Sequence, residues 1–408
     1  MERIELLAPA KDLQKAKTAL RYGADAVYIG GKRFSLRSRA SNFEMDDIRE
    51  IVEFAHEMGK KIYVTTNIVF HDEDFEGIKE YLKELETIGV DAIIVESLAV
   101  ATLCKSVAPK METHISTQTS ITNSEVVKQM AEWRAERVVL AREVDMDQIE
   151  EIASKVDTPL EVFIHGGMCS NYSGRCTLSN RMTLRDANRG GCAQSCRWKY
   201  RIFEGDEEVS DPECLLSMSS KDLRATEYIE RMIKCGVASL KIEGRMKSDY
   251  YIAQVVKTYR KMIDEVYAKG HLDEERIAYY DDELSKAENR LSDDGFLSGD
   301  CDETKHLYGV NGAGVTHEFV AYVLDFDKRN NIALIEVRNK FSFGDELEVF
   351  GPTVDNERFT VGRMVTEDYD IIEVANKPTQ LLRIKVPFIV NKHDMIRKVM
   401  NDANRRSN

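Results

Sequence analysis

The chain has 408 residues, 43% hydrophobic and 31% charged, with a formal net charge of −14 that argues against indiscriminate nucleic-acid binding. This length is too great for one ordinary core and predicts two domains. No apolar run approaches the ~20 residues that span a bilayer, and the N-terminal sequence lacks signal-peptide features, so we expect a cytoplasmic protein with no membrane segment.

Short apolar runs alternate with amphipathic segments at the spacing of β–α units. The predicted strands are residues 4–9, 25–31, 61–67, 91–97, 111–118, 136–143, 160–166 and 238–244. Several helices predicted between them end on glycine, at Gly23, Gly59 and Gly89. This succession predicts a (β/α)8, TIM-barrel-like α/β catalytic domain over residues 1–270, although an open doubly wound sheet gives the same pattern.

A long insertion, residues 167–236, follows the seventh predicted strand. Loops that leave the carboxyl ends of barrel strands build the active site in such folds, so we expect this insertion to stand there. The acidic segment 271–316 predicts a helical linker. Residues 317–400 contain short alternating strands separated by turn signals, which predicts a small C-terminal antiparallel β-barrel.

Half of the chain's eight cysteines fall within 28 residues of the insertion, in the pattern C-x6-C-x15-C-x3-C; they are Cys169, Cys176, Cys192 and Cys196. In a reducing compartment, clustered thiols indicate metal ligands or catalytic groups before disulfides. Structural zinc sites usually contain C-x2-C pairs, which are absent here. The wider gaps favour an iron–sulfur cluster, with zinc, a nucleophilic cysteine and inert packing as alternatives.

The insertion is also locally basic: residues 175–201 contain seven basic side chains and one acid, Asp186. On an acidic chain this predicts a focused anion site, and the alternative is a set of solvated arginines paired with acids elsewhere. The candidate residues for binding RNA are Arg175, Arg181, Arg185, Arg189, Arg197 and Lys199. Beside them, Trp198 is a candidate either for stacking on a nucleobase or for packing.

The block Glu161–Ser179, EVFIHGGMCSNYSGRCTLS, resembles the signature of the collagenase-like peptidase family U32, with Gly167 where the family usually has serine or alanine. The later blocks RDANRGGCAQSCRWKY, SSKDL and LKIEGRMKS resemble the family too, and the similarity extends over nearly the whole chain. Several members that resemble this sequence are tRNA hydroxylation proteins. They form 5-hydroxyuridine at the wobble position, depend on prephenate and carry a 4Fe–4S cluster.

The resemblance implies prephenate-dependent hydroxylation of a wobble uridine, with the tRNA anticodon loop as partner. It assigns cluster ligation to Cys169, Cys176, Cys192 and Cys196. Some relatives take one ligand from near the position of Ser219, and with serine there Cys196 is the better fourth ligand. Two alternatives remain: a collagenase-like peptidase, and a non-catalytic scaffold that requires a homologous partner subunit.

Prephenate is a dicarboxylate, and arginine side chains bind carboxylates in a bidentate manner. Arg37 and Arg39, which follow the second strand, are therefore predicted to bind it, with a solvated basic loop as the alternative. Polar residues near other strand ends complete the predicted substrate-binding set; they are Asn67, His114, Gln118 and Arg142.

The catalytic candidates lie at the ends of the seventh and eighth strands. His165 is the base that a cysteine nucleophile would need in a hydrolase, although the chain has neither an H-E-x-x-H nor a G-x-S-x-G motif. Glu243 and Arg245 are predicted either to form an ion pair at the barrel mouth or to place Arg245 against an anion.

Overall fold

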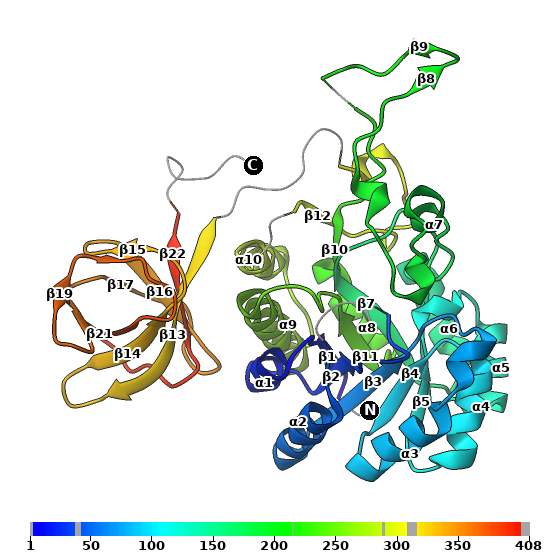
Figure 1. Cartoon of the computed structure of the whole chain (residues 1–408), viewed down its shortest axis with the longest axis horizontal. Coiled ribbons are helices and arrows are strands. Elements are labelled where there is room, and N and C mark those ends of the chain that lie inside the picture. The colour runs from blue at the N-terminus through cyan, green and yellow to red at the C-terminus, as the bar shows by residue number, and fades with distance from the viewer. Residues whose placement is uncertain (1–2, 37–41, 214, 288–289, 308–315, 401–408) are drawn as a thin grey trace.

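The structure is a computed structural model that describes residues 3–36, 42–213, 215–287, 290–307 and 316–400. A barrel with surrounding helices and a curled antiparallel sheet lie side by side (Figure 1). In the described part of the chain, no helix is both long and apolar enough to cross a membrane.

Within the described residues, eight parallel strands form the barrel: β1 (Glu5–Pro9), β2 (Ala26–Gly30), β3 (Lys61–Thr66), β4 (Ala92–Val95), β5 (Glu112–Ile115), β6 (Arg137–Val139), β7 (Leu160–Gly166) and β11 (Ser239–Ile242). Each strand pairs with the next, and β11 pairs with both β7 and β1. The ring is therefore closed. The predicted TIM-like barrel is confirmed and the open sheet is excluded.

The helices around the barrel are α1 (Leu13–Arg21), α2 (Met45–Glu57), α3 (Ile78–Ile88), α4 (Leu98–Val107), α5 (Ser124–Glu132), α6 (Met146–Lys155), α8 (Ile229–Lys234) and α9 (Asp249–Lys269). Local sequence sets their ends: the Asp12 side chain accepts from the backbone N–H of Lys15 at the start of α1, and α3 ends at Gly89 with a left-handed φ of 96°. Strand residues alternate between this helix layer and the barrel interior, so Leu6 packs outward and Leu7 inward.

Charged side chains fill the amino-terminal end of the barrel. The guanidinium of Arg137 lies 2.6 Å from Glu5 and 3.1 Å from Glu161, and the ammonium of Lys241 lies 2.6 Å from Glu161. Burial by itself would raise the pKa of Glu161, but Lys241 and Arg137 lower it to about 2. This packed network closes one end of the barrel, which leaves the carboxyl end as the place for chemistry.

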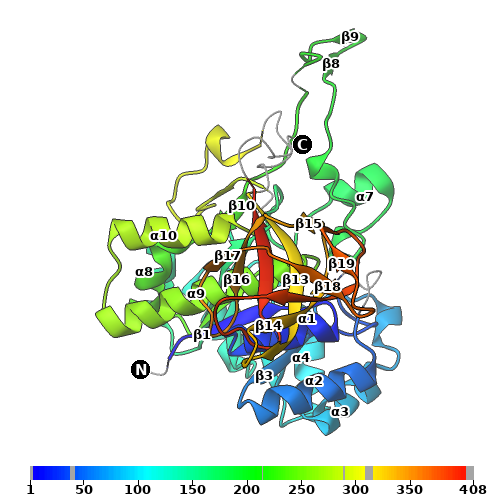
Figure 2. The same ribbon diagram turned by 90° about the vertical axis from the view of Figure 1, so that its left-hand side faces the viewer.

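The insertion after β7 contains α7 (Leu178–Thr183), the hairpin β8 (Phe203–Glu204) and β9 (Glu207–Glu208), and β10 (Asp222–Arg224), which pairs antiparallel with β7. The hairpin projects away from the body of the molecule (Figures 1 and 2). Part of the segment predicted as a linker packs on the barrel domain: α10 (Glu274–Ser285) buries Tyr280 and Leu284, and β12 (Ser292–Asp293) pairs with β10.

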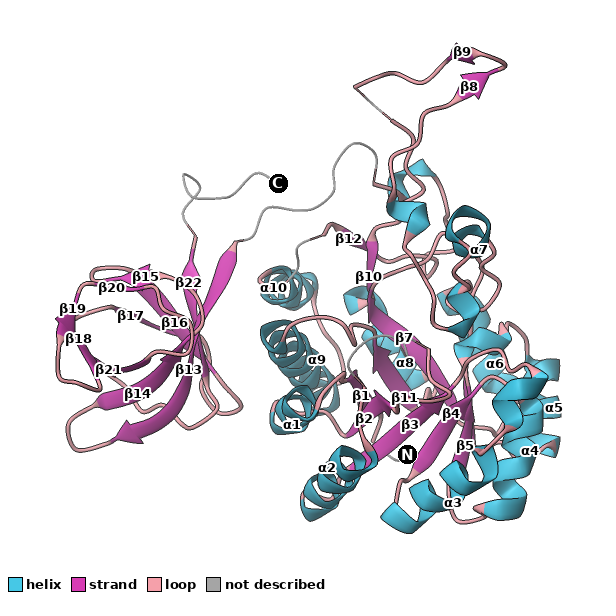
Figure 3. Cartoon of the chain, in the orientation of Figure 1, coloured by secondary structure: helices cyan, strands magenta, loops and turns pink. Residues whose placement is uncertain are grey.

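The C-terminal domain is antiparallel, as predicted, and curls into a half-barrel (Figure 3). Its main sheet has the order β17-β16-β22-β13-β14-β21-β18-β19, and β15 pairs with β20. The strands are β13 (His317–Asp327), β14 (Ile332–Val337), β15 (Phe341–Ser342), β16 (Glu346–Phe350), β17 (Glu357–Thr360), β18 (Met364–Thr366), β19 (Ile371–Ile372), β20 (Val374–Ala375), β21 (Leu381–Lys385) and β22 (Met395–Val399).

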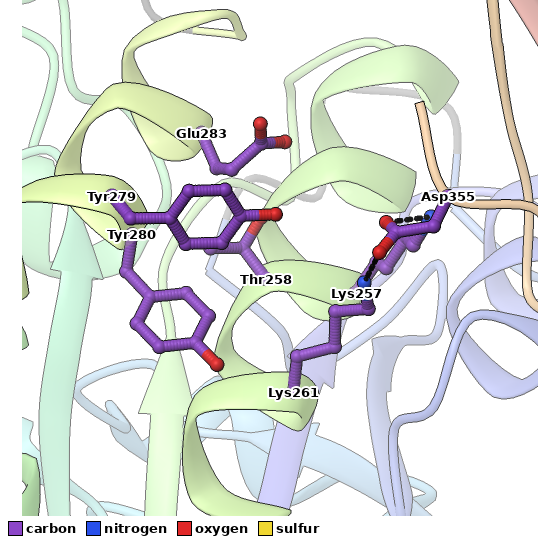
Figure 4. Close-up of a pocket in the computed structure, with 7 residues that line it drawn as sticks. All are labelled: Lys257, Thr258, Lys261, Tyr279, Tyr280, Glu283 and Asp355. Atoms are coloured by element: carbon purple, nitrogen blue, oxygen red, sulfur yellow. Dashed lines mark hydrogen bonds and ion pairs between the residues drawn. The ribbon is translucent and has the colours of Figure 1, made fainter. Parts of the chain in front are cut away.

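A buried polar network joins this domain to α9. Arg397 on β22 is fully buried; its Nε donates to Glu348 at 2.8 Å and its Nη1 to Gln254 of α9 at 2.9 Å. Beside it lies a small pocket between the domains, where Lys257 and Lys261 of α9 both pair with Asp355 (Figure 4). Because a buried guanidinium is costly unless its donors are paired, this network fixes how the two domains pack.

Candidate functional site

The cysteine-bearing segment, residues 167–198, lies over the carboxyl ends of β5, β6 and β7 and is tied to them by specific hydrogen bonds. The Glu143 carboxylate accepts from the backbone N–H of Ser173 at 2.8 Å, and the Ser120 hydroxyl donates to the Ser173 carbonyl. Arg142 Nη1 donates to the Gly167 carbonyl at 2.5 Å. Residues that directly follow β5 and β6 therefore hold the loop between the first two cysteines in place.

A glycine allows this close approach. At Gly174, an added Cβ would lie 1.9 Å from the Gln118 carbonyl oxygen, and the backbone φ of 71° is in the left-handed region. Only glycine adopts that conformation without strain and leaves room for the neighbouring backbone. The glycine between Cys169 and Cys176 is thus required for docking the loop on the strand ends.

Further hydrogen bonds join the part of the insertion that contains Cys169 and Cys176 to the part that contains Cys192 and Cys196. Asn188 Nδ2 donates to the Cys176 carbonyl at 2.9 Å, and the Ala193 backbone N–H donates to the Ser179 hydroxyl at 3.0 Å. The stretch after Cys176 is thereby fastened to the stretch around Cys192. Distant parts of the insertion converge, as a shared site requires.

The cysteines themselves are free thiols in this structure. Cys192 and Cys196 lie within electrostatic range of Cys169: burial raises the pKa of Cys169, Arg142 opposes the increase, and the two other cysteines add to it. The Cys169 surface is nevertheless exposed to solvent. This exposure leaves the thiol accessible to a cofactor or substrate.

The described residues do not form a preassembled site for a single metal ion. Among the described residues, no three His, Cys, Asp or Glu side chains are grouped closely enough to bind one metal ion. Thiolates around one zinc stand about 3.8 Å apart, because tetrahedral Zn–S bonds measure about 2.3 Å. A four-iron cluster is larger and takes thiolates that stand further apart. Ligation of such a cluster by the four cysteines stays a prediction.

A positively charged group that the sequence did not reveal lies beside Cys196. Arg290 donates to the Ser219 hydroxyl at 2.9 Å and lies 3.2 Å from the carboxylate of Asp222. Its guanidinium interacts electrostatically with Cys196 and with Arg197. Arg290 comes from the segment 271–316, more than 90 residues after Cys196, and nothing in that acidic stretch distinguished it from Arg276.

Two of the three catalytic candidates lie at the barrel mouth. Glu243 is half-buried, accepts a hydrogen bond from the Tyr28 hydroxyl at 3.1 Å and is in electrostatic range of Cys169. Arg245 is 5% exposed and donates to Ser35 at 3.0 Å and Thr65 at 3.2 Å. Glu243 is therefore placed for chemistry, whereas Arg245 braces the loop after β2.

The third candidate, His165, lies outside the mouth. The pairing of β7 with β11 slips between Lys241 and Ile242, which leaves Ile164 as an extra residue. His165 then packs against α9, where its Nδ1 lies 3.2 Å from the Tyr259 hydroxyl and 1% of its surface is exposed. Desolvation lowers its pKa to about 3, so the ring is neutral at neutral pH. This position does not serve a cysteine nucleophile.

The predicted substrate-binding residues separate into three groups. Asn67, Gln118 and Arg142 lie at strand ends, and the Gln118 side-chain oxygen is buried without a hydrogen-bond partner among the described residues. His114 is fully buried inside the barrel, where its Nε2 lies 3.0 Å from Glu112. Arg37 and Arg39 lie outside the described residues.

The predicted RNA-binding residues also separate. Arg189 pairs with Asp74 and Arg197 turns toward Gly167, so these two arginines have structural partners. The exposed set comprises Arg175, Arg181, Arg185 and Lys199, and of these Arg175 donates to Ser120 at 3.2 Å. Exposed Tyr172 and Trp198 lie in the same segment. Exposed cations together with aromatic rings are what a single-stranded nucleic acid requires.

Comparison with known proteins agrees over both domains. Residues 11–307 match peptidase family U32, and residues 315–397 match the U32 C-terminal domain. The tRNA hydroxylation protein P1 of Bacillus subtilis is 43% identical over 97% of this chain and 94% of its own length. A 23S rRNA 5-hydroxycytidine synthase of Escherichia coli is 42% identical over 65% of this chain and 40% of its own. A collagenase of Porphyromonas gingivalis is 32% identical over 94% of each chain.

Proposed function

The chain belongs to peptidase family U32, and from this premise we propose that it is an RNA hydroxylase that acts on the anticodon loop of tRNA. The reaction is hydroxylation of carbon 5 of the wobble uridine to 5-hydroxyuridine, and it requires prephenate. The observation that carries the proposal is that Cys192 and Cys196 lie within electrostatic range of Cys169, beside exposed cations at the open end of the barrel, in a chain related throughout its length to a tRNA hydroxylation protein.

The exposed cations bind the RNA backbone. Arg175, Arg181, Arg185 and Lys199 are open to solvent in or directly after the cysteine-bearing segment, so phosphates can reach them with release of counterions. The target base must leave its stack to enter the barrel mouth, and Trp198, which is 44% exposed, offers a ring for a neighbouring base.

The residues at the strand ends hold the small co-substrate. Arg142 is half-buried, where a charge-assisted bond to a carboxylate is stronger than in open water. Gln118 stands nearby as a second polar contact, and Arg37 and Arg39 remain candidates for the other carboxylate. Glu243, held by the Tyr28 hydroxyl, is the group that we assign to accept or return a proton at the mouth.

The four cysteines, Cys169, Cys176, Cys192 and Cys196, hold a 4Fe–4S cluster in this proposal. When bound, such a cluster supplies one-electron transfer. Arg290 and Arg197 place positive charge beside Cys196.

The test combines genetics with nucleoside analysis. In a strain that lacks this gene, the wild-type chain should restore 5-hydroxyuridine in tRNA, whereas Cys192→Ala should not. The matched control is Cys301→Ala, because Cys301 is an exposed thiol outside the cluster set. Anaerobically purified protein should show iron, sulfide and a cluster absorption band in the wild type and in Cys301→Ala. Full modification by Cys192→Ala, or wild-type protein without iron, would contradict the proposal.

A peptidase is the second candidate, because one relative is named a collagenase. The site offers it less support, since His165 is neutral, buried and hydrogen-bonded to Tyr259 behind β7. Cleavage of gelatin by iron-free wild-type protein, retained in Cys192→Ala, would favour the peptidase. A scaffold role would be indicated if modification in vitro occurs only after a homologous subunit is added.

A further inference from the structure

The hairpin of residues 201–210, here called the arm, projects away from the rest of the described chain (Figures 1 and 2). Its strands β8 and β9 contain two residues each, with Phe203 opposite Glu208 and Glu204 opposite Glu207. The Val209 backbone N–H donates to the Ile202 carbonyl at 2.9 Å and extends the pairing. A two-stranded hairpin is marginally stable in water by itself, so an arm of this kind gains order by docking.

One face of the arm combines apolar and acidic side chains. Because side chains alternate along a strand, Ile202 and Glu204 share this face with Val209 and Glu207 of the other strand. Ile202 is 42% exposed and Val209 is 52% exposed. Like charges directly opposite one another destabilise a hairpin, and no cation in the described part of the chain pairs with Glu204 or Glu207. A partner that complements this face must therefore supply apolar side chains and two positive charges.

Charge excludes two occupants. The arm contains four acidic side chains and one basic side chain, Arg201, which lies 3.5 Å from Glu208, so its net negative charge repels the phosphates of RNA. It repels the arm of another molecule for the same reason. A complementary surface must be basic and apolar.

The chain itself carries such a surface at the end of α7. Met182 is 46% exposed and Leu184 is 90% exposed, and Leu184 has a left-handed φ of 56°. A leucine with a left-handed backbone and an exposed apolar side chain is unfavourable in water, which indicates a contact surface. On either side of this pair, the exposed side chains of Arg181 and Arg185 form no ion pair with a described residue. Two apolar side chains lie here between two cations, which complements the apolar and acidic side chains of the arm.

We propose that the arm of one chain docks on the α7 surface of a second copy of this chain. Ile202 and Val209 meet Met182 and Leu184, and Glu204 and Glu207 meet Arg181 and Arg185. In both views the arm points away from α7 of its own chain, so the contact is between copies (Figures 1 and 2). A two-fold arrangement makes the contact twice.

The contact has two physical consequences. It is small, so the dimer is reversible, and it depends on charge, so added salt weakens it. Arg181 and Arg185 also belong to the proposed RNA surface, so RNA and the arm compete for them. The proposed dimer does not depend on the proposed hydroxylation, so each proposal can be tested without the other.

The test is sedimentation velocity of the full chain at low salt over a wide concentration range. The wild type should pass from monomer to dimer. The arm variant Glu204→Lys/Glu207→Lys and the surface variant Arg181→Glu/Arg185→Glu should each raise the dimer dissociation constant by about tenfold or more. Combining all four substitutions in one chain should restore the dimer, because the charges again match. Glu367→Lys/Asp368→Lys, which changes exposed acids of the C-terminal domain, is the control and should behave as wild type.

Three results would overturn the proposal: a wild type that stays monomeric throughout, a dimer that the arm variant leaves intact, or a four-substitution chain that stays monomeric. Loss of RNA binding in the arm variant with an unchanged monomer–dimer equilibrium would also overturn it, because the arm would then serve RNA. All substituted side chains are exposed, and thermal unfolding should confirm that each variant folds as the wild type does.

Discussion

The two ends of the barrel treat charge in opposite ways. At the amino end, Arg137, Glu161 and Lys241 are buried and paired with one another. At the carboxyl end, Arg181 and Arg185 are exposed and form no ion pair with a described residue. Buried charges occur in pairs, because an unpaired buried charge costs several kcal/mol. An exposed charge is solvated by water and remains available to bind a ligand. The comparison shows that exposed cations without an ion-pair partner, rather than charged residues in general, distinguish the carboxyl end of the barrel.

The largest expected effect comes from disrupting the buried ion pairs at the amino end of the barrel. Glu161→Ala leaves Arg137 and Lys241 buried beside a lost partner, so we expect the free energy of unfolding to fall by about 3–5 kcal/mol. Arg181→Ala at the open end should change it by less than about 0.5 kcal/mol. Urea unfolding of both variants measures the difference. Equal effects would show that the two ends do not differ as described.

A smaller effect is expected from Arg290, a cation at the open end that is paired with a carboxylate. Arg290→Met leaves the buried Asp222 carboxylate and the Ser219 hydroxyl without this donor, so we expect a loss of about 1–3 kcal/mol. Arg290→Lys, which keeps the charge, should lose less. Both variants are compared by unfolding and by the rate of iron loss in air. A stability of Arg290→Met equal to that of wild type would show that this arginine is not part of the framework.

The smallest effect concerns pH and His165. Desolvation lowers the folded-state pKa of His165 to about 3, whereas the unfolded value is about 6.5. Below about pH 6.5 the unfolded chain binds a proton that the folded chain does not, so stability is present above that pH and declines as pH falls toward 3. His165→Phe should remove a slope of at most about 1.4 kcal/mol per pH unit. Unfolding at several pH values checks this, and an unchanged slope would contradict the burial of the ring.

The parts of the fold that repeat locally were predictable. The eight strand ranges follow from apolar runs of the right length, and helix ends follow from residues such as Gly89. The cysteine pattern and the basic stretch could also be identified, because the residue types lie close together in the sequence.

The parts that depend on contacts between distant segments were not predictable. A simple alternation along β7 gives no sign that an extra residue at Ile164 turns His165 toward α9. Nor does the basic stretch reveal which cations have partners: Arg189 pairs with Asp74, which lies 115 residues away in the sequence. Arg290 likewise reaches Cys196 only through the pairing of β12 with β10.

The sequence by itself determined the succession of β–α units, the β-domain and the identity of the thiols, because hydrophobic periodicity and residue chemistry act over a few neighbouring residues. Tertiary structure alone decided that the sheet closes into a barrel, which cations stay exposed and which histidine leaves the mouth. Those outcomes depend on loop docking, strand register and burial, which join residues far apart in the chain. The exposure of the arm is a further outcome of tertiary structure, since only the folded chain shows that its face is exposed among the described residues.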